Sequence, residues 1–187
     1  EFLAQFDAKV TIRIDRLLNA PLPVDEMVLE ASLEKAVVEI SKAEWRLAGS
    51  PVAAQASLDM NSDCARLKSG FRFSEFSLEH LNRFLGDGAS LDGRVAEAEL
   101  SSQSCGKTVL EHIESLQATI AAFGLTGSWD GERLPLTLHS LQAEINWNEP
   151  GKLSLDGLLL EEKLSLSAGY GSITSIQSGN HWPLNIE

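Results

Sequence analysis

Apolar and polar residues alternate along most of this chain, which is the pattern of β-strands with one buried and one solvated face. In the first such segment, Phe6, Val10 and Ile14 belong to the apolar series, while Lys9 and Arg13 belong to the polar series between them. The same alternation recurs in residues 27–33, 38–47, 52–60, 67–73, 96–100, 118–122, 136–138, 141–147, 153–155 and 164–170. The pattern therefore predicts about ten strands.

One segment changes phase within itself. The apolar positions run through Val38 and Ile40, and then continue through Ala43, Trp45 and Leu47. An extra residue in one strand of a pair produces such a slip, so we expect a β-bulge near Lys42.

The segments between the predicted strands are short and carry turn residues. Gly and Pro occur in residues 48–51 and 148–151, and Asp-Gly sequences occur in residues 86–88 and 130–131. Short connections join antiparallel neighbours, because parallel strands need a long crossover. The predicted fold class is all-β and mainly antiparallel, a long curled meander with two short helices. Its apolar face must be covered by curling, by a second layer of a sandwich, or by a bound apolar ligand.

Two segments have helical rather than strand periodicity. Ser77 is a plausible N-cap for residues 78–85, and Thr108 with Glu111 has the spacing of a capping box. Each segment has its apolar residues on one stripe. We expect both helices to cap or plug an end of the apolar sheet. The stripe of the second helix consists of Leu110, Ile113 and Leu116.

Length and charge restrict the classes of function. With 187 residues and 43% hydrophobic composition, the chain can form one folded domain without a metal or a disulfide framework. The 27 acidic residues exceed the 15 basic ones, and the net charge is −12. No run of Lys and Arg offsets this charge, so binding to nucleic acids or to acidic membrane surfaces is not expected. No apolar run approaches the roughly 20 residues of a membrane-spanning helix.

The residues that carry enzyme chemistry do not form recognisable motifs. The four histidines, at positions 80, 112, 139 and 181, lack the spacing of paired metal ligands. The chain has no Gly-x-Ser-x-Gly elbow and no phosphate-binding glycine loop. Glu161 and Glu162 fit a solvated strand end better than a catalytic carboxylate pair. We therefore expect no enzyme activity, no catalytic residue, no metal and no cofactor.

Tryptophan supplies an alternative interpretation. Trp45 and Trp147 are in phase with the aliphatic residues around them, which favours core or lining positions. If Trp129 and Trp182 are exposed, they could stack on sugars. The chain would then be a closed β-sandwich that serves as a structural or carbohydrate-binding module.

The two cysteines are brought to one edge by the predicted meander. Cys64 follows one strand, and Cys105 follows a strand two passes later. In an oxidising compartment we expect a Cys64–Cys105 disulfide that adds about 2–4 kcal/mol. The alternative is a pair of free thiols in a reducing cytosol.

Residues 6–17, 22–29 and 43–49 have a repeating strand pattern, which resembles that of the AsmA-like family of bacterial envelope proteins. Residues 155–169 followed by His181-Trp182-Pro183-Leu184 resemble its strand pair with a Trp-Pro-Leu element, and residues 88–93 with 110–116 resemble its alternation of a strand and a short helix.

The resemblance implies a periplasmic location, in a parent protein anchored in the inner membrane by an N-terminal helix. It further implies that the apolar sheet face conducts phospholipid toward the outer membrane, as in the eukaryotic bridge-like lipid transfer proteins, with a role in outer-membrane biogenesis and lipid homeostasis. Other envelope proteins are possible partners. The chain begins at Glu1-Phe2 and ends in strand-like residues 183–187. We therefore expect residues 1–187 to be a single β-rich segment of a longer protein, with membrane contact only through the rest of that protein.

The expected ligand is a phospholipid or another molecule with acyl chains, because aliphatic surface shelters such chains without directional bonds. The same residues would also suit plain core packing, which alternation alone does not distinguish. The candidate lining residues are Val10, Ile12, Ile14, Leu29, Leu33, Trp45, Leu58, Phe71, Phe73, Leu100, Ile120, Ile145, Trp147, Leu155, Leu166 and Tyr170.

Overall fold

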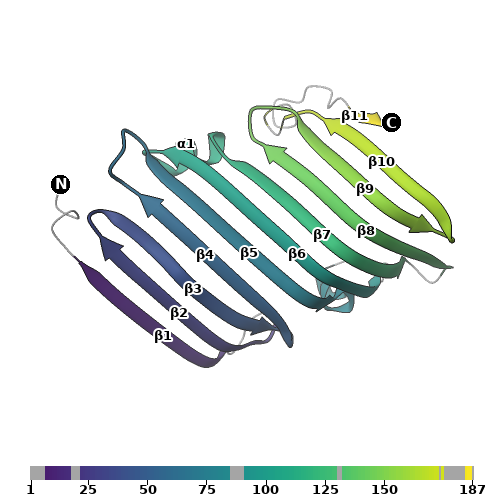
Figure 1. Cartoon of the computed structure of the whole chain (residues 1–187), viewed down its shortest axis with the longest axis horizontal. Coiled ribbons are helices and arrows are strands. Elements are labelled where there is room, and N and C mark those ends of the chain that lie inside the picture. The colour runs from purple at the N-terminus through teal and green to yellow at the C-terminus, as the bar shows by residue number, and fades with distance from the viewer. Residues whose placement is uncertain are drawn as a thin grey trace.

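The computed structural model describes residues 7–17, 22–84, 91–129, 132–172, 174 and 184–186. These residues form one 11-stranded antiparallel sheet whose strands lie side by side in chain order (Figure 1). The predicted all-β meander is confirmed. The strands are β1 (Ala8–Leu17), β2 (Val24–Glu34), β3 (Val37–Leu47), β4 (Ser50–Asp59), β5 (Ala65–Ser77), β6 (Leu91–Gly106), β7 (Gln117–Trp129), β8 (Glu132–Asn146), β9 (Gly151–Leu159), β10 (Glu162–Tyr170) and β11 (Leu184–Ile186).

Two short helices interrupt the meander, where the sequence predicted them. The 3-10 helix η2 (Leu78–Phe84) follows β5, and α1 (Val109–Glu114) follows β6. The Thr108 hydroxyl accepts a hydrogen bond from the Glu111 backbone N–H at 3.2 Å. The Glu111 carboxylate accepts one from the backbone N–H of Lys107. Two donors at the start of α1 are thus satisfied by the residues of the predicted capping box.

The sheet is a single open layer. β1 and β11 are its two edges, and they do not pair with each other. The described residues contain no second sheet, so the closed sandwich that we considered as an alternative is not formed by them. The predicted bulge is present, because the register between β3 and β4 shifts between Ile40 and Ala43.

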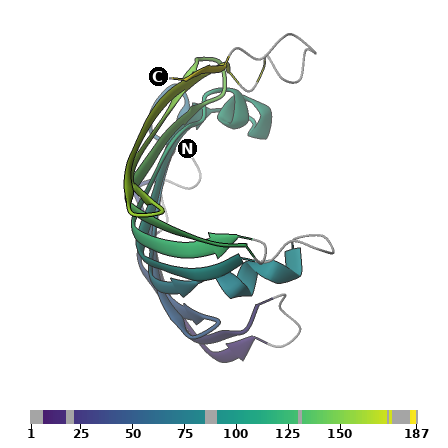
Figure 2. The same cartoon turned by 90° about the vertical axis from the view of Figure 1, so that its right-hand side faces the viewer.

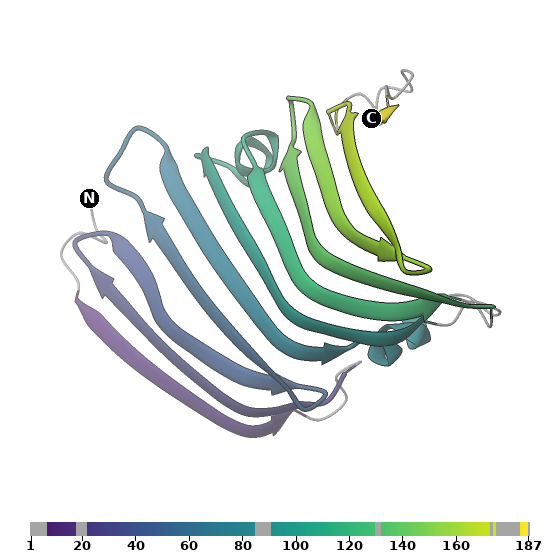
Figure 3. The same ribbon diagram turned by 45° about the vertical axis from the view of Figure 1, so that its right-hand side comes forward.

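The two faces of the sheet differ in chemistry and in curvature. Figures 2 and 3 show that the strands bend along their length and that both helices lie on the concave side. The helix α1 lies over Ser104 and Gly106: the Ser104 hydroxyl is 2.9 Å from Nδ1 of His112. Ser104 pairs with Leu67 in the register of β5 and β6. The concave face is therefore the face of Leu67 and of the other residues in the apolar series.

An irregularity crosses four neighbouring strands near their η2 ends, and we call it the kink line. It consists of Glu75, Ala96, Gly124 and His139. Glu75 and Gly124 have left-handed backbone conformations, with φ of 54° and 60°. The register of β8 against β9 shifts between Leu138 and Ser140, on either side of His139. Irregular residues of this kind bend strands, and four of them side by side bend the sheet.

The kink line also redirects the apolar series. On one side, Phe73, Ala98, Ala122 and Leu141 form a continuous row of paired residues, and on the other side the row is Phe76, Val95, Leu125 and Leu138. Each strand steps by three residues between the rows rather than two. The rings of Phe73 and Phe76 are 6.4 Å apart, as residues on one face should be. Our expectation that Ala96 continues the series of Ala98 and Leu100 is therefore wrong, because Val95 takes that place beyond the bend.

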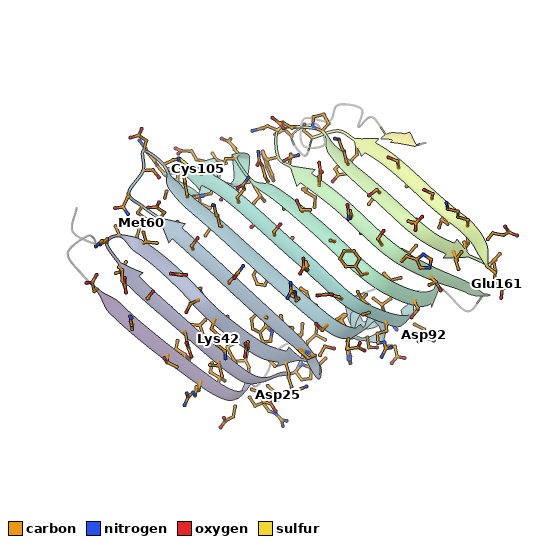
Figure 4. The ribbon with its side chains drawn as sticks, in the orientation of Figure 1. Asp25, Lys42, Met60, Asp92, Cys105 and Glu161 are labelled. Atoms are coloured by element: carbon orange, nitrogen blue, oxygen red, sulfur yellow. A yellow bond between two sulfur atoms is a disulfide. The ribbon has the colours of Figure 1, made fainter. Side chains whose placement is uncertain are left out.

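The convex face is polar. Figure 4 views the sheet from this side, where side chains that end in nitrogen or oxygen stand over the strands. Cross-strand ion pairs join many of them: Arg72 contacts Glu97 and Glu99, and Arg94 contacts Glu75 at 2.7 Å. The hydrogen bond that Arg72 donates to Glu99, together with the charges of both carboxylates, raises the pKa of Arg72.

No helix in the described part of the chain has the length and apolar character needed to cross a membrane.

Candidate functional site: the concave apolar face

The register of the sheet places the predicted lining residues together. Fifteen of the sixteen lie in strands and on the concave face, and they extend from β1 to β10. The exception is Trp147, which lies just after β8. Its backbone N–H donates to the Leu116 carbonyl, and its carbonyl accepts from the backbone N–H of Thr174.

The lining side chains are only partly covered by protein. Val10 and Ile12 on the edge strand are 50% and 44% exposed, and the other lining side chains are half-buried. The hydrophobic residues that are well buried are few, and most of them are alanines. A single layer covers its side chains from one side only. In the described residues, the apolar face is therefore a surface that is open to a ligand.

A row of small side chains crosses the middle of this face. Ala56, Ser69, Ser102 and Ala118 are paired in succession across β4, β5, β6 and β7. Larger side chains flank the row, Leu67 on the side of α1 and Phe71, Leu100 and Ile120 on the other side. The two serine hydroxyls are 2.7 Å apart and bond to each other. The side chains of this row are small, and its two hydroxyls are satisfied by each other. An acyl chain could therefore lie across the row without leaving a polar group unpaired.

Depressions on the opposite, convex face have a different character. One of them is lined by alanines and other small or apolar residues together with five charged or amide side chains, which are Lys42, Glu44, Gln55, Arg72 and Glu99. Lys42 is paired with Glu44 and Arg72 with Glu99, so the charges in this depression are matched by ion pairs.

The three described histidines lie apart and have different partners. The described residues include no group of three or more His, Cys, Asp or Glu side chains that could hold a metal ion. His80 packs against the ring of Phe76, His112 bonds to Ser104, and His139 lies 3.7 Å from Asp156. His181 lies outside the described residues.

The alternative interpretation as a carbohydrate-binding module depends on Trp129 and Trp182. Trp182 and the side chain of Trp129 lie outside the described residues. Trp45 pairs with Val52 on the concave face, as its phase predicts.

Cys64 and Cys105 form a disulfide, with Cα atoms 5.5 Å apart. The bond ties the start of β5 to the end of β6, at the edge where the meander brings the two cysteines. The Ser115 side chain extends this tie to α1, because its Oγ accepts from the Cys105 N–H at 2.9 Å and donates to the Cys105 carbonyl at 2.8 Å.

The helix α1 turns its polar side to the sheet. His112 and Ser115 make hydrogen bonds with residues of β6. Beneath the helix, a Cβ added to Gly106 would lie 2.7 Å from the Glu111 Cβ. Val109 and Leu110 are 77% and 62% exposed. The helix therefore turns its polar side to the sheet, because Ser104 and Gly106 offer a hydroxyl and a bare backbone there.

Comparison with family models, with curated proteins and with solved structures gave no match to this chain.

Proposed function

We propose that this chain binds the acyl chains of phospholipid on its concave face and lets them move along it, as a non-enzymatic segment of an envelope protein. The observation that carries the proposal is the open apolar face, which continues through ten strands without a second layer over it in the part of the chain that the structure describes. Burial of apolar surface is favourable and non-directional, so a chain on this face can slide without breaking specific bonds.

Two further features support the proposal. The resemblance of the strand motifs to AsmA-like proteins favours transport of phospholipid between envelope membranes. The Cys64–Cys105 disulfide favours an oxidising compartment such as the periplasm. The net charge of −12 is compatible with this function, because charged side chains stand on the convex face, where ion pairs such as Arg72 with Glu97 lie.

A photocrosslinking experiment tests the proposal with neighbouring residues on opposite faces. A benzophenone amino acid replaces Ile120 on the concave face in one variant and Thr119 on the convex face in the other. Each purified protein is irradiated with vesicles that contain phosphatidylethanolamine with radiolabelled acyl chains. We expect labelled lipid on the Ile120 variant, at least about tenfold above the Thr119 variant.

Extraction provides an independent readout. Organic extracts of the purified wild-type protein should contain phospholipid in mass spectrometry. Equal crosslinking at positions 119 and 120, together with extracts free of phospholipid, would rule the proposed function out.

A further inference from the structure

The helix α1 presents an apolar stripe that the other described residues cover only in part. Two residues of the predicted stripe, Leu110 and Ile113, lie within α1 and are 62% and 38% exposed, and the adjacent Val109 is 77% exposed. Successive helical residues are about 100° apart, so these three side chains share one side of the helix. Glu111, His112 and Ser115 share the opposite side, which rests on β6. Apolar side chains at this exposure are costly in water unless something else covers them.

The position of α1 connects this stripe with the concave face. Figure 2 shows α1 on the concave side of the sheet, at one end of the strands. Beside it on the same face lies Leu67, which pairs with Ser104 and is 36% exposed. Apolar surface therefore continues from the strands, through Leu67, to the region of α1. The stripe and the sheet face can contact the same apolar ligand.

The attachment of α1 fixes the helix in this position. Ser115 bonds to both backbone groups of Cys105, and Cys105 is covalently joined to Cys64. Asn148, after β8, donates a hydrogen bond to the Glu114 carbonyl at 2.7 Å. All of these ties involve the polar side or the ends of the helix. They hold α1 without using its apolar side chains.

We infer that α1 is a second wall of the lipid site, whose stripe contacts the acyl chains of a phospholipid at this end of the concave face. The inference rests on the proposed function and assigns Leu110 and Ile113 to the same site. The polar side of α1 anchors the wall to the strands, and the apolar side faces the ligand.

The test adds one position to the crosslinking experiment. The benzophenone amino acid replaces Leu110, and the protein is irradiated with the same phosphatidylethanolamine vesicles beside the Ile120 and Thr119 variants. We expect lipid labelling at Leu110 within about threefold of that at Ile120 and well above that at Thr119. Labelling at Ile120 without labelling at Leu110 overturns the inference and leaves the proposed function intact. A protein–protein adduct as the sole product at Leu110 also overturns it.

A substitution gives a second readout that does not depend on the probe. Leu110→Glu with Ile113→Glu replaces two exposed side chains, so the melting temperature should stay close to that of the wild type. The phospholipid recovered by extraction should fall at least about threefold. Thr119→Glu, which adds a charge to the convex face, is the matched control and should retain the wild-type amount. Unchanged phospholipid in the double variant would contradict the role of the stripe.

Discussion

The two ends of the strands are stabilised by different means. At the η2 end, beyond the kink line, the sheet bends, and side chains on its concave face pack against one another. Among the residues whose side chains the structure describes, the buried hydrophobic residues larger than alanine are Val52, Val95 and Leu138, and all three lie toward this end. At the α1 end, the buried residues are small, and a disulfide with polar hydrogen bonds connects β5, β6 and α1. Packing holds one end, and covalent and polar ties hold the other while leaving apolar surface open.

The largest expected effect comes from the covalent tie at the α1 end. Cys64→Ser with Cys105→Ser opens a loop with a sequence separation of 41, which in the chain-entropy model lowers the free energy of unfolding by about 4 kcal/mol. Urea unfolding followed by circular dichroism measures this loss. Reduction of the wild type should produce a similar loss. A loss below about 1 kcal/mol would show that packing holds both ends.

The second prediction compares one substitution at two places on the concave face. Leu138→Ala, beyond the kink line, removes a side chain that is 4% exposed and should cost about 3 kcal/mol. Leu166→Ala, on the half-buried part of β10, should cost about 1 kcal/mol because less surface is withdrawn from water there. Urea unfolding measures both. Equal costs would mean that the kink line does not create a separate packed region.

The smallest effect concerns a polar tie at the α1 end. The Tyr170 hydroxyl donates to the Glu144 carbonyl, and burial, followed by the charge of Glu144, raises the pKa of Tyr170. The folded protein therefore keeps this proton more firmly than the unfolded chain does. The resulting stability is complete below the unfolded pKa of about 10 and is lost as the pH rises through the folded pKa.

Thermal melting at pH 8 and at pH 11 checks this dependence. The wild type should lose more stability between the two values than Tyr170→Phe does, because phenylalanine has no proton to release. An identical loss of stability in both proteins would show that the hydroxyl of Tyr170 does not stabilise this end of the sheet.

The sequence was sufficient to predict the regular parts of this fold. Strict alternation predicted the strands, and the slip between Ile40 and Ala43 predicted a bulge that the register confirms. The kink line was harder to predict, because its signal is a three-residue step that falls at matching positions in four strands. The spacing of Leu138 and Leu141 contains that step, but only the pairing of β8 with β7 gives it a structural meaning.

The candidate site, like the fold, could be predicted from the sequence only in part. Alternation placed residues such as Ile120 and Leu155 on one face, because a side chain's face follows from its position in a strand. The stripe of α1 was visible in the sequence, but its direction was not. An amphipathic helix shows which side is apolar, whereas the side that packs depends on the surface beneath it. Here that surface is Ser104 and Gly106, in the last residues of the strand that leads into the helix.

The kink line has a consequence for how a ligand would be received. The left-handed backbone at Glu75 and Gly124 sets the curvature of the strands through local geometry. The concave shape is consequently preorganised, since it needs no bound molecule to create it. An acyl chain that reaches this surface would not have to spend binding energy on bending the sheet, and its departure would not flatten the sheet. A surface of constant shape suits a path that many molecules use in succession.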